Sequence, residues 1–318
     1  RDQMRADDGK LPKVKIRNQH GAGLLEMVDL MRRAEGGSVE SQYELALQLW
    51  RGHEVAADRR SAQEWIERAA LQGLSKAQVM MGNIWRLGLT GFHSLRLAAF
   101  WYAKAAASDS AEGLYRLAVL YRDEQGLAGN SQCWLSLMQR SAEAGYLRAM
   151  LVMADYYLAQ RRNWQLAVHW YRVAAASGDI ASLYLLGQMF RHGGAGVPMN
   201  MTNALVYFHL AAEQGMWQAQ VELARTLLFL DQNSPEAVEW LRRGLNADLN
   251  DVNDAVSKIR TGQLSIGQWV APEPPLRLYK EEAALEDPLE LTEGAENQIL
   301  DKLKLSGLRN SQGPGVES

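Results

Sequence analysis

A small residue recurs along the chain at a nearly constant interval, and this interval limits the possible folds more than any other feature. Ala or Gly closes six similar strings, and successive markers lie 36, 36, 36, 33 and 37 residues apart. Nine positions before each marker stands a turn-type residue, which is Gly in five repeats and Asp109 in the sixth. No strand pattern accompanies this period, so the sequence predicts an all-α solenoid of stacked helical hairpins. The markers are Ala46, Gly82, Ala118, Ala154, Gly187 and Ala224.

The second helix of each predicted hairpin carries small residues around a large pair. Trp101 and Tyr102, for example, stand between Ala98 and Ala105. These intervals of three and four place the residues on one helical face, where alanine allows a close approach between helices. Because the first large residue repeats with the period, we expect it in the core rather than in a ligand box. The set comprises Trp65, Trp101, Trp170, Tyr207 and Trp240.

The linker inside the hairpins is patterned as well. Gly52 precedes Asp58 by six residues, and Gly194 precedes Asn200 by the same interval. Asp or Asn at this place is suited to cap the second helix. Two hairpins have a shorter linker, and in one of them Ser234-Pro235 predicts a direct helix start, with Ser as the N-cap.

The linker and second helix together give GxGVxxD/N…AxxWYxxAAxxG, followed by AxxxLG, and this pattern resembles the Sel-one-like repeat, a relative of the tetratricopeptide repeat. The best matches are residues 194–215, 52–73 and 98–113, and the resemblance covers roughly residues 38–260. It implies an α-solenoid of about six to seven helix-turn-helix repeats. It also implies adaptor work in signalling, secretion, cell-envelope assembly or host interaction, without shared catalytic residues.

Three regions follow from composition. Residues 1–23 are predicted to be a flexible basic lead-in with a net charge of +3, and residues 24–262 form the repeat solenoid. Residues 263–318 are a Pro-containing acidic tail, in which residues 271–304 carry a net charge of −5. We expect this tail to be largely disordered, with one short helix near residues 295–305.

Composition also excludes several classes of function. The net charge of −3 argues against nucleic-acid binding, which needs a concentrated basic surface. No run of 18 apolar residues is present, so no membrane span is expected in this chain. Cys133 is the only cysteine, which excludes an intrachain disulfide, and we expect it to be a small buried hydrophobe. The chain begins at Arg1 rather than Met, so we expect that an upstream segment was removed or omitted, and a signal peptide or an anchor is one candidate for it. The compartment stays open, with a bacterial periplasm or envelope favoured over cytoplasm.

Motifs for catalysis or metal binding are not apparent. The cluster Gly193–Gly196 is followed by Val197-Pro198 rather than by Lys-Ser/Thr, so it predicts a turn and not a phosphate loop. The six histidines do not pair with one another or with Cys133 at helical spacing, and no HExxH string occurs. We therefore predict no enzyme activity, no cofactor and no metal.

The first helices carry the candidate binding residues. In tetratricopeptide-like stacking, residues one, four and five positions after the marker turn toward the concave side. Four arginines fall at the first two of these positions and would form a broken ladder suited to carboxylates, while Trp50 offers an apolar anchor. The alternative is a solvated helix face, where Arg is simply a good helix former. The candidate groove comprises Trp50, Asn83, Arg86, Arg122, Asp155, Gln188, Arg191 and Arg225.

These patterns favour a non-enzymatic interaction scaffold or adaptor, within a bacterial cell-envelope or secretion assembly. The alternatives are a regulator that controls a signalling enzyme, and a protein that binds cell wall or glycan. The partner is a protein or peptide, with acidic segments favoured. The segment Glu281–Glu296 is itself a candidate ligand, either as a plug or as a docking arm. The alternating basic and apolar residues Leu11–Arg17 suit an added strand or an acidic partner.

Overall fold

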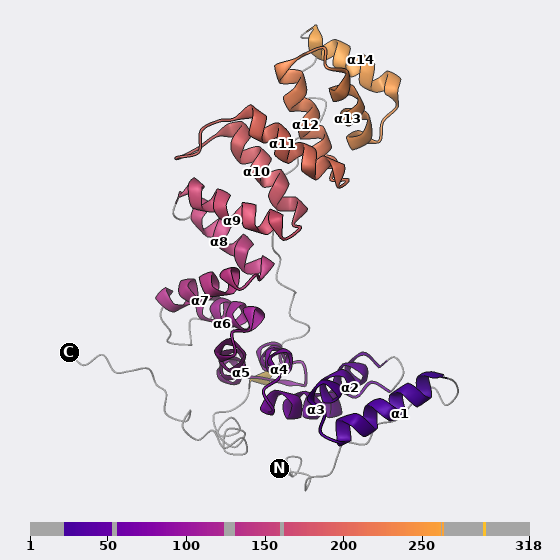
Figure 1. Cartoon of the computed structure of the whole chain (residues 1–318), viewed down its shortest axis with the longest axis vertical. Coiled ribbons are helices and arrows are strands. Elements are labelled where there is room, and N and C mark those ends of the chain that lie inside the picture. The colour runs from indigo at the N-terminus through magenta and orange to yellow at the C-terminus, as the bar shows by residue number, and fades with distance from the viewer. Residues whose placement is uncertain are drawn as a thin grey trace, which may run out of the picture. The chain divides into compact units, whose positions relative to one another are not determined.

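The computed structural model describes residues 22–52, 56–123, 131–159, 162–261, 263 and 289–290. Within these residues it contains fourteen helices, which confirms the predicted all-α solenoid of paired helices (Figure 1). The chain divides into two compact units, and the division falls between α7 and α8. Each unit is described separately below.

The first unit contains one leading helix and three hairpins. Helix α1 packs against α2, and the hairpins are α2 with α3, α4 with α5, and α6 with α7. Each hairpin also packs against the next, because α3 contacts α4 and α5 contacts α6. The helices are α1 (Ala22–Glu35), α2 (Val39–Arg51), α3 (Arg59–Leu71), α4 (Ser75–Leu87), α5 (Leu95–Ala107), α6 (Ala111–Asp123) and α7 (Ser131–Glu143).

The second unit contains three further hairpins and a closing helix. The hairpins are α8 with α9, α10 with α11, and α12 with α13, and α14 packs against α13. The six hairpins described in the two units agree with the repeat number predicted from the period. The helices are α8 (Leu147–Ala159), α9 (Trp164–Ala176), α10 (Ile180–His192), α11 (Met201–Glu213), α12 (Trp217–Leu230), α13 (Pro235–Leu245) and α14 (Leu249–Arg260).

Turn and cap residues act as the sequence predicts. The glycines that precede the first helices have φ between 85° and 96°, and Asp109 adopts φ 52° at the same place in its repeat. The side chain of Asp58 accepts hydrogen bonds from two backbone amides at the start of α3, and Asn200 caps α11. Ser234 caps α13, with Pro235 in the first turn. These contacts satisfy amides that a helix start would otherwise leave unpaired.

The core lies between the helices of each hairpin and between successive hairpins. The alanine markers are fully buried, as are Trp65 and Trp101, while Trp170 and Trp240 are less than a tenth exposed. The prediction that these tryptophans are core residues is therefore confirmed. Tyr207 differs, because it is only half-buried and its ring stacks on Phe190 with 5.6 Å between centroids.

The prediction for Cys133 was wrong, because this cysteine is exposed on α7. Cys133 stands one residue before Trp134, which replaces the first small residue of the second helix. In other repeats this place holds the buried Leu97 or the exposed Leu166 and Glu236. The helical register alone therefore does not decide whether a residue at this place is buried.

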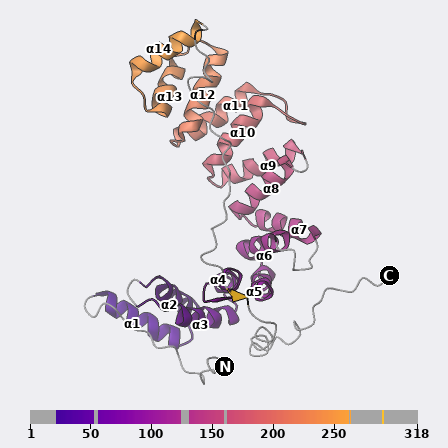
Figure 2. The same ribbon diagram turned by 180° about the vertical axis from the view of Figure 1, so that it is seen from behind.

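One feature of the fold lies outside the helical period. Strand β1 (Phe92–His93), in the linker between α4 and α5, pairs in parallel with β2 (Leu289–Glu290), with Phe92 opposite Leu289. Both views show β2 beside α4 and α5 (Figures 1 and 2). The two residues of β2 belong to the predicted acidic tail. The other predictions for the lead-in and the tail fall outside the described residues.

Candidate functional site

The predicted site residues all reach the surface of the first helices. Each lies one or four positions after its marker, and each is half-buried or exposed in the structure. This burial agrees with a face that partner molecules can reach, but it does not by itself distinguish a binding groove from a solvated helix face. The contacts of each side chain show which of the predicted residues lie together.

In the first unit, two of these residues meet the second helix of their own hairpin. The hydroxyl group of Tyr102 on α5 donates a hydrogen bond of 2.7 Å to Oδ1 of Asn83. Burial raises the pKa of Tyr102, and the positive charges of Arg86 and Arg116 act in the opposite direction. Asn83, Arg86 and Tyr102 therefore form one polar group that α4 and α5 share.

The remaining two predicted residues of this unit make separate contacts. Trp50 packs partly against the core, and the guanidinium group of Arg59 lies 5.7 Å from the centroid of its ring. Arg122 forms an ion pair of 2.5 Å with the adjacent Asp123 at the end of α6. The contacts described for Trp50 and Arg122 therefore differ from the hydrogen bond that joins Asn83 to Tyr102.

In the second unit, Asp155 on α8 repeats the arrangement of Asn83. The hydroxyl group of Tyr171 on α9 donates a hydrogen bond of 2.5 Å to Oδ1 of Asp155. Although the residue as a whole is exposed, the atoms crowded around its carboxyl group raise its pKa, against the lowering effect of the Tyr171 hydrogen bond. One oxygen of this carboxylate is therefore already hydrogen-bonded within its own hairpin.

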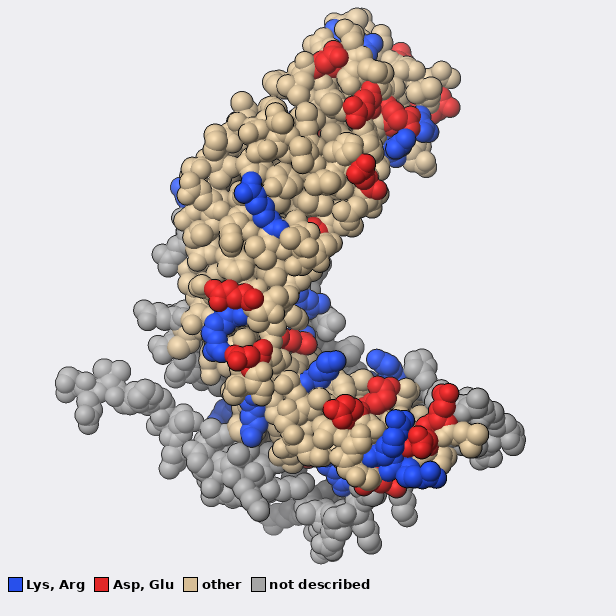
Figure 3. Space-filling view, viewed as in Figure 1, with Lys and Arg blue, Asp and Glu red and all other residues tan. Residues whose placement is uncertain are grey.

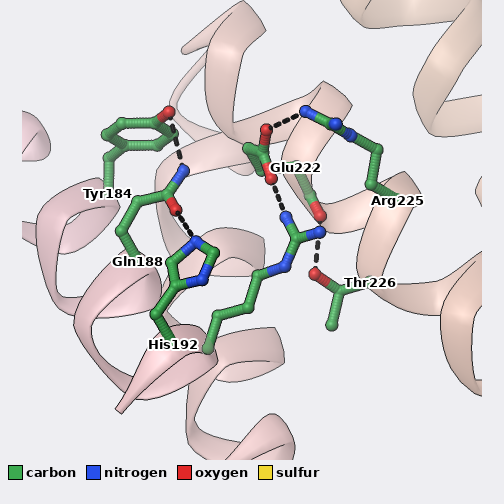
Figure 4. Close-up of polar contacts among 7 residues, drawn as sticks. Tyr184, Gln188, His192, Glu222, Arg225 and Thr226 are labelled. Carbon is green, nitrogen blue, oxygen red and sulfur yellow. Dashed lines mark hydrogen bonds and ion pairs between the residues drawn. The ribbon is translucent and has the colours of Figure 1, made fainter. Parts of the chain in front are cut away.

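The other three predicted residues come together across two neighbouring repeats. Arg191 of α10 and Arg225 of α12 both form ion pairs with Glu222, and the Arg225 contact measures 2.7 Å from Nη1 to Oε1. Figure 4 shows the carboxylate of Glu222 between the two guanidinium groups. We call this group, with the polar residues that adjoin it, the α10–α12 polar cluster; it comprises Tyr184, Gln188, Arg191, His192, Glu222, Arg225 and Thr226.

The neighbouring side chains of the cluster form a second chain of hydrogen bonds. Nε2 of Gln188 donates to the hydroxyl oxygen of Tyr184 at 2.9 Å, and Oε1 of Gln188 lies 3.1 Å from Nε2 of His192 (Figure 4). Thr226 donates to the backbone carbonyl of Glu222 one turn earlier. The amide of Gln188 is therefore held at both ends, which fixes it beside Arg191.

Glu222 is the member of the cluster that sequence reasoning missed as a site residue. It stands two positions before its marker, outside the positions expected to face the groove. Its residue is 9% exposed, and a charge so far covered is stable only when it is paired. A Glu beside two arginines in adjacent repeats was the available signal, but only stacking shows that α10 and α12 bring them together.

The second helices explain why the cluster differs from the other repeats. The residue one position after the marker lies opposite a fixed position of the second helix. Opposite Asn83 this position holds Tyr102, and opposite Asp155 it holds Tyr171. The corresponding residues opposite Gln188 and Arg225 are Phe208 and Leu241, which offer no hydrogen-bonding group. Gln188 and Arg225 therefore make their hydrogen bonds with residues of the first helices instead.

Two further observations concern the charge and the hydrogen bonds of the cluster. The side chains of Arg191 and Arg225 are 20% and 15% exposed, and among the described residues a single carboxylate, that of Glu222, is paired with both. Nε of Arg225 is buried and has no hydrogen-bond partner among the described residues. The arrangement therefore carries one positive charge in excess and one unpaired donor.

Other kinds of site find no support in the described part of the chain. Searched there, His, Cys, Asp and Glu residues form no group that could hold a metal ion. No helix among the described residues is long and apolar enough to cross a membrane. On the face seen in Figure 3, basic and acidic side chains of the described residues are interspersed and form no continuous basic surface.

Comparisons with known proteins agree with this architecture. The family model for the Sel1 repeat matches residues 39–74, 75–110, 147–179, 180–216 and 217–249, more than half of the chain. A solved Sel1 repeat protein from Oxalobacter formigenes is 26% identical and superposes with a TM-score of 0.57, over 72% of this chain and 68% of that one. A protective antigen of uropathogenic Escherichia coli strains that displays an SLR fold is 24% identical, with a TM-score of 0.56, over 92% and 60% of the two chains. The latter likeness shows the fold alone.

Among curated proteins, chitin synthase regulatory factor 3 of Schizosaccharomyces pombe is 27% identical over 201 residues. The matched stretch covers 59% of this chain but only 21% of that relative. The matched stretch thus spans about a fifth of this relative's length.

Proposed function

This chain belongs to the Sel1 repeat family, and we propose that it is a non-enzymatic scaffold that holds an acidic segment of a protein partner on its first-helix face. Sel1 repeat proteins generally mediate protein–protein interaction, and stacked hairpins provide an extended surface for this purpose. The supporting observation is the α10–α12 polar cluster, in which the polar residues of two successive repeats form one surface group. Guanidinium groups suit this role because they grip carboxylates bidentately.

A photo-crosslinking experiment tests which face of the chain meets the partner. A photoreactive amino acid is placed at Asn83 or Gln188 on the first-helix face, and at the exposed Ala103 or Ala176 on the second helices as matched controls. We expect protein adducts from the first two positions and few from the controls. Adducts only from the second helices would contradict the proposal, as would crosslinks only to nucleic acid or lipid.

The location of the scaffold is a further part of the proposal. We place it in a bacterial cell-envelope or secretion assembly; the support is that the solved Sel1 repeat protein reported above comes from a bacterium, Oxalobacter formigenes. Fractionation of the native host, followed by detection of the chain and its crosslinked partner, tests this point. Recovery of the complex only with cytosolic enzymes would overturn the envelope assignment while leaving the scaffold role intact.

A regulatory function is the second candidate, and the name of a relative favours it. The matched protein from Schizosaccharomyces pombe is a chitin synthase regulatory factor, which suggests that repeats of this type can act on an enzyme. The two candidates differ in what binding does. If the crosslinked partner is an enzyme and the purified chain changes its turnover, the regulatory function holds; unchanged turnover in a stable complex favours the scaffold.

A further inference from the structure

We infer that the α10–α12 polar cluster is a carboxylate-binding site, in which Arg191 and Arg225 receive an acidic side chain or a C-terminal carboxylate of an extended peptide. This inference rests on the proposed function and narrows it to one place in the second unit. It depends on charge, hydrogen bonding and the position of Glu222, which are taken in turn.

The charges of the cluster do not balance. Of the residues that form the cluster, Arg191 and Arg225 carry positive charges and Glu222 carries a negative one. Two guanidinium groups with little exposed surface thus share a single carboxylate. A charge that is largely removed from water is stabilised by an opposite charge nearby. An incoming carboxylate would therefore neutralise the positive charge that Glu222 does not.

The hydrogen bonds of the two arginines also leave donors for an incoming carboxylate. Arg191 and Arg225 each bind Glu222 through one Nη atom. Nε of Arg225 is covered and unpaired, so it reaches an incoming carboxylate only when the guanidinium group turns outward. That turn gives up the Nη1 contact with Glu222, and in exchange it presents the Nε–Nη edge, which binds a carboxylate bidentately.

Glu222 shows that the two arginines are arranged for this chemistry. Its carboxylate contacts both guanidinium groups, one through each oxygen (Figure 4). The two guanidinium groups therefore lie at a separation that one carboxylate can span. A second carboxylate from the partner would extend this alternation outward, with Gln188 and His192 as polar neighbours.

The site is tested by fluorescence anisotropy with short amidated Gly/Ser peptides that contain two central Glu residues. The same peptide with Gln in place of Glu serves as the neutral control, and a Gly/Ser peptide with a free C-terminus tests the other source of a carboxylate. We expect the Glu peptide or the free-terminus peptide to bind at low salt, and the Gln peptide to bind at least about tenfold more weakly. Equal binding of the Glu and Gln peptides, with none by the free-terminus peptide, would overturn the inference, as would equally effective competition by inorganic phosphate.

Three variants of the full chain sharpen the test. Arg225→Ala should weaken binding about tenfold or more, because a charge-assisted contact is lost, and Arg225→Lys should restore only part of it. Glu222→Gln should strengthen binding, because it removes the internal carboxylate that shares the arginines. A gain of affinity cannot come from unfolding, so this variant keeps the test valid if Arg225→Ala is poorly folded.

The matched control is Arg243→Ala, which removes an exposed arginine that is ion-paired with Glu239 on the neighbouring α13. It should leave peptide affinity unchanged. If the α10–α12 variants are silent while Arg86→Ala weakens binding, the inference fails and the proposed function stands. If the wild-type chain binds none of the peptides but still gives first-helix crosslinks to a protein, the carboxylate site is again refuted without the scaffold role.

Discussion

The position that a β-carbon would take at Gly187 lies 2.5 Å from Cδ1 and Cε1 of Phe208. Gly187 is the small marker of α10, and Phe208 is the large residue that the second helix of the same hairpin places against it. Real β-carbons do not approach other atoms this closely, so the absence of a side chain at Gly187 is what allows the aromatic ring to be fully buried.

The same compensation occurs in one other hairpin. A β-carbon at Gly82 would lie 2.3 Å from Cε1 of Tyr102. At these two places the Gly marker and the aromatic ring opposite share one volume. An aromatic partner does not always require Gly, however, because the marker Ala154 stands in the repeat whose second helix carries Tyr171 at the same position.

We predict that Gly187→Ala destabilises the second unit by about 1–3 kcal/mol through overpacking, although alanine is the better helix former. Phe208→Leu alone should cost about 1–2 kcal/mol, because it leaves a space in the core. The double variant should be more stable than the sum of the two effects predicts, and urea denaturation measures this coupling. Additive effects would show that the two side chains do not compete for the same volume.

The hydrogen bond between Tyr171 and Asp155 gives a prediction about pH. Burial raises the pKa of Asp155 above its ordinary 3.8, and the hydrogen bond from Tyr171 lowers it. Tyr171→Phe removes the donor that favours the carboxylate, so the pKa of Asp155 should rise further. A carbon-detected NMR titration of the Asp155 carboxyl group measures the change, and a downward shift would contradict it.

The sign of the effect on stability follows from the same pKa. Because the pKa of Asp155 is higher in the folded state, the contribution of this group to stability is fully present below 3.8 and is lost as the pH rises through the folded value. In Tyr171→Phe this loss should be complete only at a higher pH than in the wild type. Asp155→Asn serves as the control, since its stability should show no such step.

The repeat length and the chemistry of the turns were enough to predict the fold. The interval between markers set the number of hairpins, and residues such as Asp58 and Ser234 marked where second helices begin. These features are local, because a cap or a turn is determined within a few residues. Trp65 and Trp101 were predicted as core residues for a similar reason, since their place on the helix repeats with the period.

The contacts of the arginines could not be predicted in the same way. The register placed Arg122 and Arg191 at equivalent positions, yet Arg122 pairs with the adjacent Asp123, whereas Arg191 pairs with Glu222 of the next repeat. Side-chain partners depend on which neighbouring residues happen to be charged, and this varies between repeats.

Charge reversal at Arg191 would also place a carboxylate beside the buried Glu222, so truncation of the side chain to alanine is the cleaner test of binding.

The exposure of Cys133 leads to a direct chemical prediction. Its side chain lies on the surface of α7, so a thiol reagent should modify one group per chain in the native protein, without denaturant. Cys133→Ser should abolish the reaction and leave the melting temperature nearly unchanged, because no core contact is lost. A thiol that reacts only after unfolding would restore the earlier expectation of a buried cysteine.

The pairing of β1 with β2 predicts a measurable effect of the tail on the first unit. Phe92 is 42% exposed, and the ladder between Phe92–His93 and Leu289–Glu290 joins the α4–α5 linker to the acidic segment. A chain that ends at residue 281 lacks β2, so backbone amides of β1 should exchange with deuterium faster, while the amides of α4 and α5 stay protected. Addition of a peptide spanning residues 282–296 should restore the protection, and the same peptide with Leu289→Pro should do so poorly, because proline removes a backbone donor. Unchanged exchange in the truncated chain would show that this pairing does not hold the tail to the repeats.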